Sequence, residues 1–171
     1  MSTPESPGRR RLPWKKIVGF GLLGLLGLFL VIQLVPYGRD HSNPPVTKAA
    51  VFSDPKARQI VAASCNDCHS NLTRWPWYTH VAPASWLTYN DVQEGRSKMN
   101  LSEWDKPQPA LDEVIRQVGP GGEMPPFKYT VMPNHADARL SDADRAILVK
   151  AFRDLYANEP PGGIKADGGG G

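Results

Sequence analysis

Hydrophobic residues fill one early stretch of the chain and recur at helical spacing in several later ones. Residues 17–35 are uncharged and mostly Leu, Gly, Val, Ile and Phe, with Gln33 the only strongly polar side chain. At about 1.5 Å per residue, a helix of this length spans roughly 28 Å, close to the hydrocarbon thickness of a bilayer. The pattern predicts a single transmembrane helix.

The charges that flank this stretch predict its orientation. Residues 1–16 form a basic tail that contains Arg9, Arg10, Arg11, Lys15 and Lys16. Because basic residues favour the cytoplasmic side of a membrane, we expect this tail in the cytoplasm. A cleaved signal peptide usually ends in small residues, but no A-x-A pattern directly follows Val35. We therefore expect a single-pass signal anchor in the inner (cytoplasmic) membrane, with the rest of the chain on its periplasmic side.

Apolar positions after the span indicate helices. Asp54-Pro55 is typical of an N-cap followed by proline at the first helical position, and it predicts a helix that leads to Cys65. Residues 83–98 are expected to form a second helix. A third has apolar residues at positions i, i+3, i+4 and i+7 and ends at a glycine: Leu111, Val114, Ile115, Val118 and Gly119.

A capping-box pattern at residues 141–144 predicts the start of a terminal helix. Its apolar face would consist of Ile147, Leu148, Phe152, Leu155 and Tyr156. The sequence therefore predicts an all-α domain at residues 52–157. Residues 36–51 are polar and contain prolines, which indicates a linker, and the Pro- and Gly-rich residues 158–171 are expected to be a disordered tail.

The net charge changes little in this picture. The chain carries a formal charge of +3, but residues 1–16 hold five basic side chains and only one acidic side chain, Glu5. The part beyond the span is therefore close to neutral. Nothing in it indicates a nucleic-acid partner.

Candidate chemistry is concentrated at Cys65-Asn66-Asp67-Cys68-His69. A C-x-x-C-H motif is the signature for covalent attachment of haem c. Two intervening residues place the thiols about one helical turn apart, so that each can form a thioether with one vinyl group of the porphyrin. His69 then presents an imidazole to the iron from the same turn.

Three other interpretations of the cysteines are weaker. A thioredoxin-type C-x-x-C would lie near a βαβ pattern, and no clear strand pattern is visible. A zinc site needs a second ligand pair at short spacing, whereas His41, His80 and His135 are scattered. A structural disulfide across two residues would close a strained loop that stabilises the fold poorly.

The motif near an early helix, a proline-rich loop with a methionine, and a capped terminal helix resemble small class I cytochromes c. A closer resemblance extends through the segments CNDCHSNLTRWPWYTHVAPASWL, DVQEGRSKMNLSEW, GEMPPFKY and HADARLSDAD. These segments resemble the haem-binding domain family of bacterial exported or membrane-anchored proteins. The resemblance implies a cytochrome c-like helical domain around one covalently bound haem c.

The sixth iron ligand is left open by the sequence. Met124 is the preferred distal ligand, because cytochromes c commonly offer a methionine from such a loop and a thioether suits iron. His135 and Met132 are the main alternatives, and Met99 and His80 are further ones. In the competing interpretation, Met124 only fills space beside the haem.

Basic and aromatic side chains follow the motif closely. Arg74 and Arg96 could neutralise the haem propionates, and Trp77 could donate its indole N–H to them. An equally strong interpretation is that the tryptophans build the core.

Two classes of function fit these features. The first is an electron carrier that passes single electrons between redox partner proteins, which the sequence does not identify. The second is a gas or redox sensor, or a peroxidase-like protein, with an open or displaceable sixth ligand. Electron transfer is favoured over catalysis because two axial ligands are available and no Arg-His pair typical of a peroxidatic site is evident. The sequence does not indicate an oligomeric state.

Overall fold

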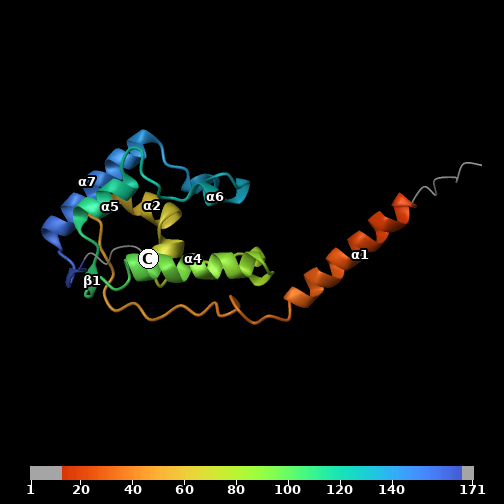
Figure 1. The fold of residues 1–171 in the computed structure, drawn as a ribbon. Coiled ribbons are helices and arrows are strands. Elements are labelled where there is room, and N and C mark those ends of the chain that lie inside the picture. Colours follow the sequence, from red (N-terminus) through yellow and green to blue (C-terminus); the bar gives the residue numbers. More distant parts are fainter. Residues whose placement is uncertain (1–12, 167–171) are drawn as a thin grey trace, which may run out of the picture.

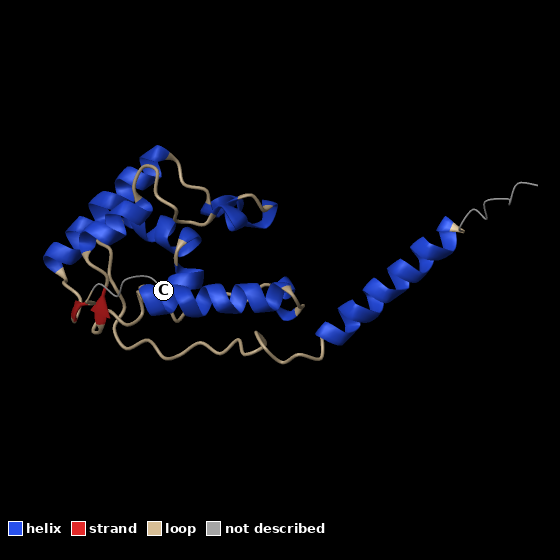
Figure 2. Ribbon diagram, viewed as in Figure 1, coloured by secondary structure: helices blue, strands red, loops and turns tan. Residues whose placement is uncertain are grey.

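Helices make up most of the structure. The computed structural model describes residues 13–166, which form one long apolar helix followed by a small helical domain (Figures 1 and 2). The helices are α1 (Trp14–Ile32), α2 (Pro55–Ser64), α3 (Asn66–His69), η1 (Trp77–His80), α4 (Ala84–Lys98), α5 (Leu111–Val118), α6 (Phe127–Thr130), η2 (Pro133–Ala138) and α7 (Asp142–Asn158). The strands β1 (Pro107–Gln108) and β2 (Gly163–Ile164) form a parallel pair. The expected helical fold is confirmed for these residues.

The first helix corresponds to the predicted span, displaced by three residues. It extends away from the domain (Figure 1), and none of its side chains is buried. It is long and apolar enough to cross a membrane. The basic tail predicted for residues 1–16 lies mostly outside the described residues.

The helix ends follow the capping signals in the sequence. The Asp54 carboxylate accepts hydrogen bonds from the backbone N–H groups of Lys56 (2.7 Å) and Ala57 (3.4 Å) at the start of α2. Ser141 and Asp144 form the expected capping box at the start of α7, and α5 ends at Gly119. All three signals are local, so the sequence is sufficient to predict them.

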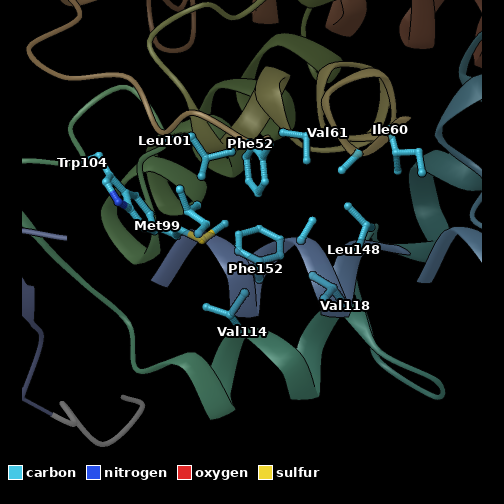
Figure 3. Packing of buried hydrophobic residues seen from close by; sticks show 13 residues of the cluster. Phe52, Ile60, Val61, Met99, Leu101, Trp104, Val114, Val118, Leu148 and Phe152 are labelled. Atoms are coloured by element: carbon cyan, nitrogen blue, oxygen red, sulfur yellow. The ribbon is translucent and has the colours of Figure 1, made fainter. Parts of the chain in front are cut away.

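The core lies between α2, α5 and α7. Figure 3 shows Phe152 and Leu148 of α7 pointing toward Phe52 and Val61, while Val118 of α5 closes the other side. The rings of Phe52 and Phe152 meet edge to face with centroids 5.1 Å apart. This core places the C-terminal end of α2 beside the loop that follows α4.

The connector at residues 36–51 runs along the domain in extended form. Ala50 donates a backbone hydrogen bond to Leu101 (2.7 Å), and Lys48 accepts one from Trp104 (2.8 Å). The Asn71 side chain donates to the carbonyl oxygen of Pro45 (2.9 Å). A segment without helical or strand periodicity is thus held by backbone hydrogen bonds to distant residues.

The C-terminal segment is also packed as far as Lys165, which differs from the disordered tail expected for these residues. The buried Trp104 donates its indole N–H to the Glu159 carbonyl (2.7 Å). Beyond it, β2 pairs with β1, and Lys165 donates its backbone N–H to Gln108 (2.8 Å). Each of these contacts uses a backbone group of the C-terminal segment, which a Pro- and Gly-rich composition does not reveal. The predicted tail at residues 167–171 lies outside the described residues.

Candidate functional site

The C-x-x-C-H motif forms a single turn at the end of α2. Cys65 follows the last residue of α2 and donates its backbone N–H to Val61 (2.9 Å), while its own carbonyl accepts from His69 (2.9 Å). Cys65 and Cys68 are free thiols, both half-buried. The structure therefore brings Cys65, Cys68 and His69 into one turn, as their spacing predicts.

Burial keeps both thiols protonated at neutral pH. It raises the pKa of Cys65 to about 12, with a smaller contribution from Cys68. The pKa of Cys68 rises to about 11 through burial and then through the negative charges of Asp91 and Asp67. Disulfide exchange uses the thiolate, which this environment disfavours.

The His69 ring is oriented by a hydrogen bond to the backbone of the loop that follows α4. Its Nδ1 lies 3.2 Å from the carbonyl oxygen of Met99, and the His69 carbonyl accepts from Leu101 N–H (2.7 Å). Burial lowers the pKa of His69, so the ring is neutral and carries a single N–H. With that N–H on Nδ1, Nε2 has the lone pair that a metal ligand needs.

Helix α4 packs directly on this turn at Gly95. A Cβ atom at Gly95 would lie 2.5 Å from the Cys68 carbonyl oxygen and 3.0 Å from the Cys68 Cβ. Real Cβ atoms essentially never come this close to backbone, so a larger residue would push α4 away from the motif. The glycine lets the two backbones touch.

Buried amides hold the loop that carries Met99. Gln108 accepts from the backbone N–H of Asn100 (2.9 Å), and the Asn100 side chain donates to Asn71 (2.8 Å). Asn71 in turn donates its backbone N–H to the Ser102 hydroxyl (2.9 Å). Sequence reasoning missed these positioning residues, because no motif marks a polar residue that is satisfied by distant backbone.

Met124 lies in the loop between α5 and α6. Its backbone N–H donates to Gln117 (3.1 Å), and its carbonyl accepts from the Arg145 guanidinium (3.1 Å). It lines an open hollow of about 920 Å³ between the loop before α6 and the start of α7. The two cysteines and His69 are not among the residues that line this hollow, and Met124 stays the predicted distal ligand.

The alternative ligands have varied surroundings. His135 Nε2 lies 2.6 Å from the Tyr78 hydroxyl, and its ring packs against Tyr129. Met132 is exposed and Met99 belongs to the core. The exposed His80 packs edge to face on His41, whose ring stacks on Trp75, and no hydrogen bond links this group to the motif turn among the described residues.

Both predicted propionate-binding arginines have protein partners. Arg74 forms an ion pair with Asp67 (3.0 Å), which raises the pKa of the guanidinium. Arg96 donates to the Ser70 carbonyl (2.9 Å) and to the Thr73 hydroxyl (2.9 Å), and its pKa is lowered by burial.

The tryptophans differ in their exposure and in whether their indole N–H groups have hydrogen-bond partners. Trp77, the predicted propionate contact, is 78% exposed. In contrast, the indole N–H groups of Trp75 and Trp86 are buried and have no hydrogen-bond partner among the described residues. A buried donor is costly without an acceptor, so these two groups could serve an acidic ligand.

The donor set of the motif turn fits covalently bound haem. Two thiols one turn apart could form the two thioethers, and a neutral imidazole with Nε2 available could bind the iron. Their positions follow from the helix end, the Met99 carbonyl and the contact at Gly95.

Comparisons with known proteins agree with this geometry. The model of the haem-binding domain family matches residues 27–154, which is most of the chain and includes the motif turn, α4 and the Met124 loop. No curated protein and no solved structure matches the chain. The match confirms the resemblance read from the sequence and supports haem binding. The chain belongs to the haem-binding domain family.

Proposed function

We propose that the chain is a membrane-anchored monohaem c-type cytochrome that transfers single electrons on the periplasmic side of the inner membrane. The observation that carries the proposal is the motif turn, in which two free thiols precede a His69 ring that is fixed through Nδ1 to the Met99 carbonyl. Haem, when bound, supplies an iron that accepts and donates one electron.

Each residue of the site has a defined task in this proposal. Cys65 and Cys68 hold the porphyrin by thioethers, and His69 Nε2 is the proximal ligand. The Met99 carbonyl keeps the imidazole in the tautomer that can bind a metal, and its bond raises the basicity of the ring. Met124 is the proposed distal ligand, in a cytochrome c-like arrangement.

The proposed anchor is α1. None of its apolar side chains is buried, and lipid is the environment that would cover them. The basic residues before the helix favour a cytoplasmic N-terminus and therefore a periplasmic domain. Unknown redox proteins on that side would be the partners.

Covalent attachment is tested by denaturing the protein produced with c-type maturation. Haem should migrate with the wild-type chain on a denaturing gel and give a c-type pyridine haemochrome spectrum. The double variant Cys65→Ala, Cys68→Ala should lose this covalent haem, whereas Ser64→Ala next to the motif should keep it. Haem that acid acetone extracts from the wild type would contradict the proposal.

An exchangeable sixth ligand is the alternative, and the open hollow that Met124 lines has room for a small ligand. Such a protein would act as a gas or redox sensor or as a peroxidase-like protein. An optical spectrum of the ferrous protein with and without carbon monoxide separates the two functions. Rapid binding of carbon monoxide would favour the alternative, whereas an unchanged spectrum would favour the electron carrier.

A further inference from the structure

The end of α1 is attached directly to the domain. Gln33, the residue after α1, donates its side-chain N–H to the Ala82 carbonyl (3.0 Å) and accepts from the Ala82 backbone N–H (2.9 Å). One amide thus satisfies both backbone groups of a residue just before α4. We call this pair of hydrogen bonds the Gln33 clamp.

The chain that follows the clamp stays close to the domain. Gly38 has a positive φ of 73°, and a Cβ atom there would lie 2.5 Å from the Ser85 carbonyl oxygen in the first turn of α4. Tyr37 packs edge to face on Tyr89, with ring centroids 5.5 Å apart. The family match also begins inside α1, at residue 27. The clamp and these contacts leave the domain little freedom to move away from the end of α1.

Exposed apolar side chains gather at the end of the domain nearest to α1. They are Leu34, Tyr37, Trp77, Leu87, Phe127 and Val131, of which Phe127 and Val131 also line the hollow beside Met124. Figure 1 shows α6 and the start of α4 on the side of the domain toward α1. The Tyr78–His135 hydrogen bond and the Tyr129–His135 ring contact link η1 to η2 and α6, which keeps these parts together.

Two of these side chains are unusually exposed for their size. Trp77 and Phe127 are each 78% exposed, although burial of such rings is strongly favourable. Tryptophan and tyrosine are enriched at membrane–water interfaces, and arginine is suited to lipid phosphates. Arg39, which donates to the Gln33 carbonyl beside the end of α1, supplies such a cation.

We propose that this end of the domain, defined by Tyr37, Trp77, Leu87, Phe127 and Val131, rests in the interface of the bilayer that α1 crosses, and that the Gln33 clamp holds it there. The inference rests on the proposed membrane anchor. Lipid is the partner of this face, because the Gln33 clamp holds the face at the depth in the bilayer at which α1 ends. The haem domain would thus be held in one orientation on the membrane surface.

Photo-crosslinking from lipid tests the proposal on the full, haem-loaded chain. The protein is reconstituted into vesicles of phosphatidylcholine and phosphatidylglycerol that contain a lipid with a diazirine near its headgroup. After illumination, tryptic peptides 75–96 and 117–128 should carry lipid adducts, as should the peptide from α1. Peptide 154–165, whose exposed Ile164 lies on β2 at the other end of the domain, should carry none.

The positions of the adducts test the docked face and the membrane anchor separately. Adducts on α1 without adducts on peptides 75–96 and 117–128 would overturn the docked face and leave the anchor standing. Absence of adducts from α1 itself would overturn the anchor.

Substitution of the clamp tests the second part of the proposal. Gln33→Ala should lower the adducts on peptides 75–96 and 117–128 several-fold while those on α1 stay the same. Gln59→Ala, an exposed glutamine of α2, is the matched control and should change neither. Equal adducts in Gln33→Ala and wild type would contradict the role of the clamp.

Discussion

The Met99 carbonyl oxygen favours the tautomer of His69 that leaves Nε2 available. A neutral imidazole has one N–H, and the Met99 carbonyl at 3.2 Å from Nδ1 fixes it there. Met99 is itself held by its backbone hydrogen bond to Gly95 (3.0 Å). A main-chain acceptor of this kind cannot rotate away as a side chain can, so the ring is preorganised before any ligand binds Nε2.

Replacement of Met124 tests the proposed distal ligand. A thioether ligand favours ferrous iron and raises the reduction potential, so Met124→Ala should abolish the sulfur-to-iron charge-transfer band and lower the potential. Optical spectroscopy and redox titration measure the two effects. Met132→Ala, at an exposed methionine, is the control and should change neither. A spectrum that Met124→Ala leaves unaltered would rule out this ligand.

The sequence predicts the residues of the motif but not the groups that surround them in the fold. Cys65, Cys68 and His69 are predictable as a group, because the geometry of one helical turn follows from their spacing. The Met99 carbonyl is not, since every residue has the same backbone acceptor and only the fold selects one. Arg96 also contacts residues more than twenty positions away, and no local pattern marks such pairs.

Among the secondary-structure elements, the longer helices of the domain were predictable, whereas the short helices η1, α6 and η2 and the extended segments were not. α2, α5 and α7 have apolar faces and capping residues that act over a few positions. The connector at residues 36–51 and the segment after α7 are held by hydrogen bonds to residues far away in the sequence. Such pairing depends on the fold of the whole domain, which the composition of these segments does not report.

We expect one added methyl group at the contact between α3 and α4 to lower the stability of the fold. Alanine has a higher helix propensity than glycine by about 1 kcal/mol, so Gly95→Ala would stabilise an isolated α4. The added Cβ, 2.5 Å from the Cys68 carbonyl oxygen, should outweigh this gain and lower the free energy of unfolding by about 1–3 kcal/mol. Urea unfolding measures the change.

A second alanine on the same helix provides the control for Gly95. Asn90→Ala, at an exposed position of α4, should leave the protein as stable as the wild type or slightly more so. If Gly95→Ala behaved like Asn90→Ala, the close contact between α4 and the motif turn would be wrong.

The docking of α7 should depend on alkaline pH through Tyr156. Burial raises the pKa of this phenol from 10 to about 12, and its hydroxyl donates to the Pro109 carbonyl (2.7 Å). Since the folded-state pKa lies above the unfolded one, the contribution of the neutral phenol is fully present below pH 10. It is lost as the pH rises through about 12.

Replacement of Tyr156 separates its contribution from the general loss of stability in alkali. Tyr156→Phe should lower the free energy of unfolding by about 1 kcal/mol at neutral pH, because a hydrogen bond is lost. The difference from the wild type should narrow above pH 10. Tyr37→Phe, which removes the hydroxyl of a half-exposed ring, is the control for Tyr156→Phe. A difference that stays constant between neutral pH and pH 12 would contradict the argument.

On the scale of the whole molecule, α6 links α4 to the Met124 loop through one carboxylate. Asp91 of α4 accepts from Lys128 (2.8 Å) and from the Tyr129 hydroxyl (2.5 Å), both on α6. Asp91 also contributes to the raised pKa of Cys68, which indicates that this junction lies close to the motif turn. Removal of the carboxylate should therefore release α6 from α4 while the core between α2, α5 and α7 remains intact.

Hydrogen exchange measures this release. A hydrogen bond to a charged group contributes about 1.5–3 kcal/mol, and the exposure of Lys128 places the expected loss in Asp91→Ala near the lower end. Amides of residues 127–130 should then exchange about tenfold faster, while those of α7 keep their wild-type rates. Glu94→Ala, which removes an exposed carboxylate from the same helix, should leave both sets unchanged. If exchange in α7 accelerated together with α6, Asp91 would support the whole domain rather than the junction between α4 and α6.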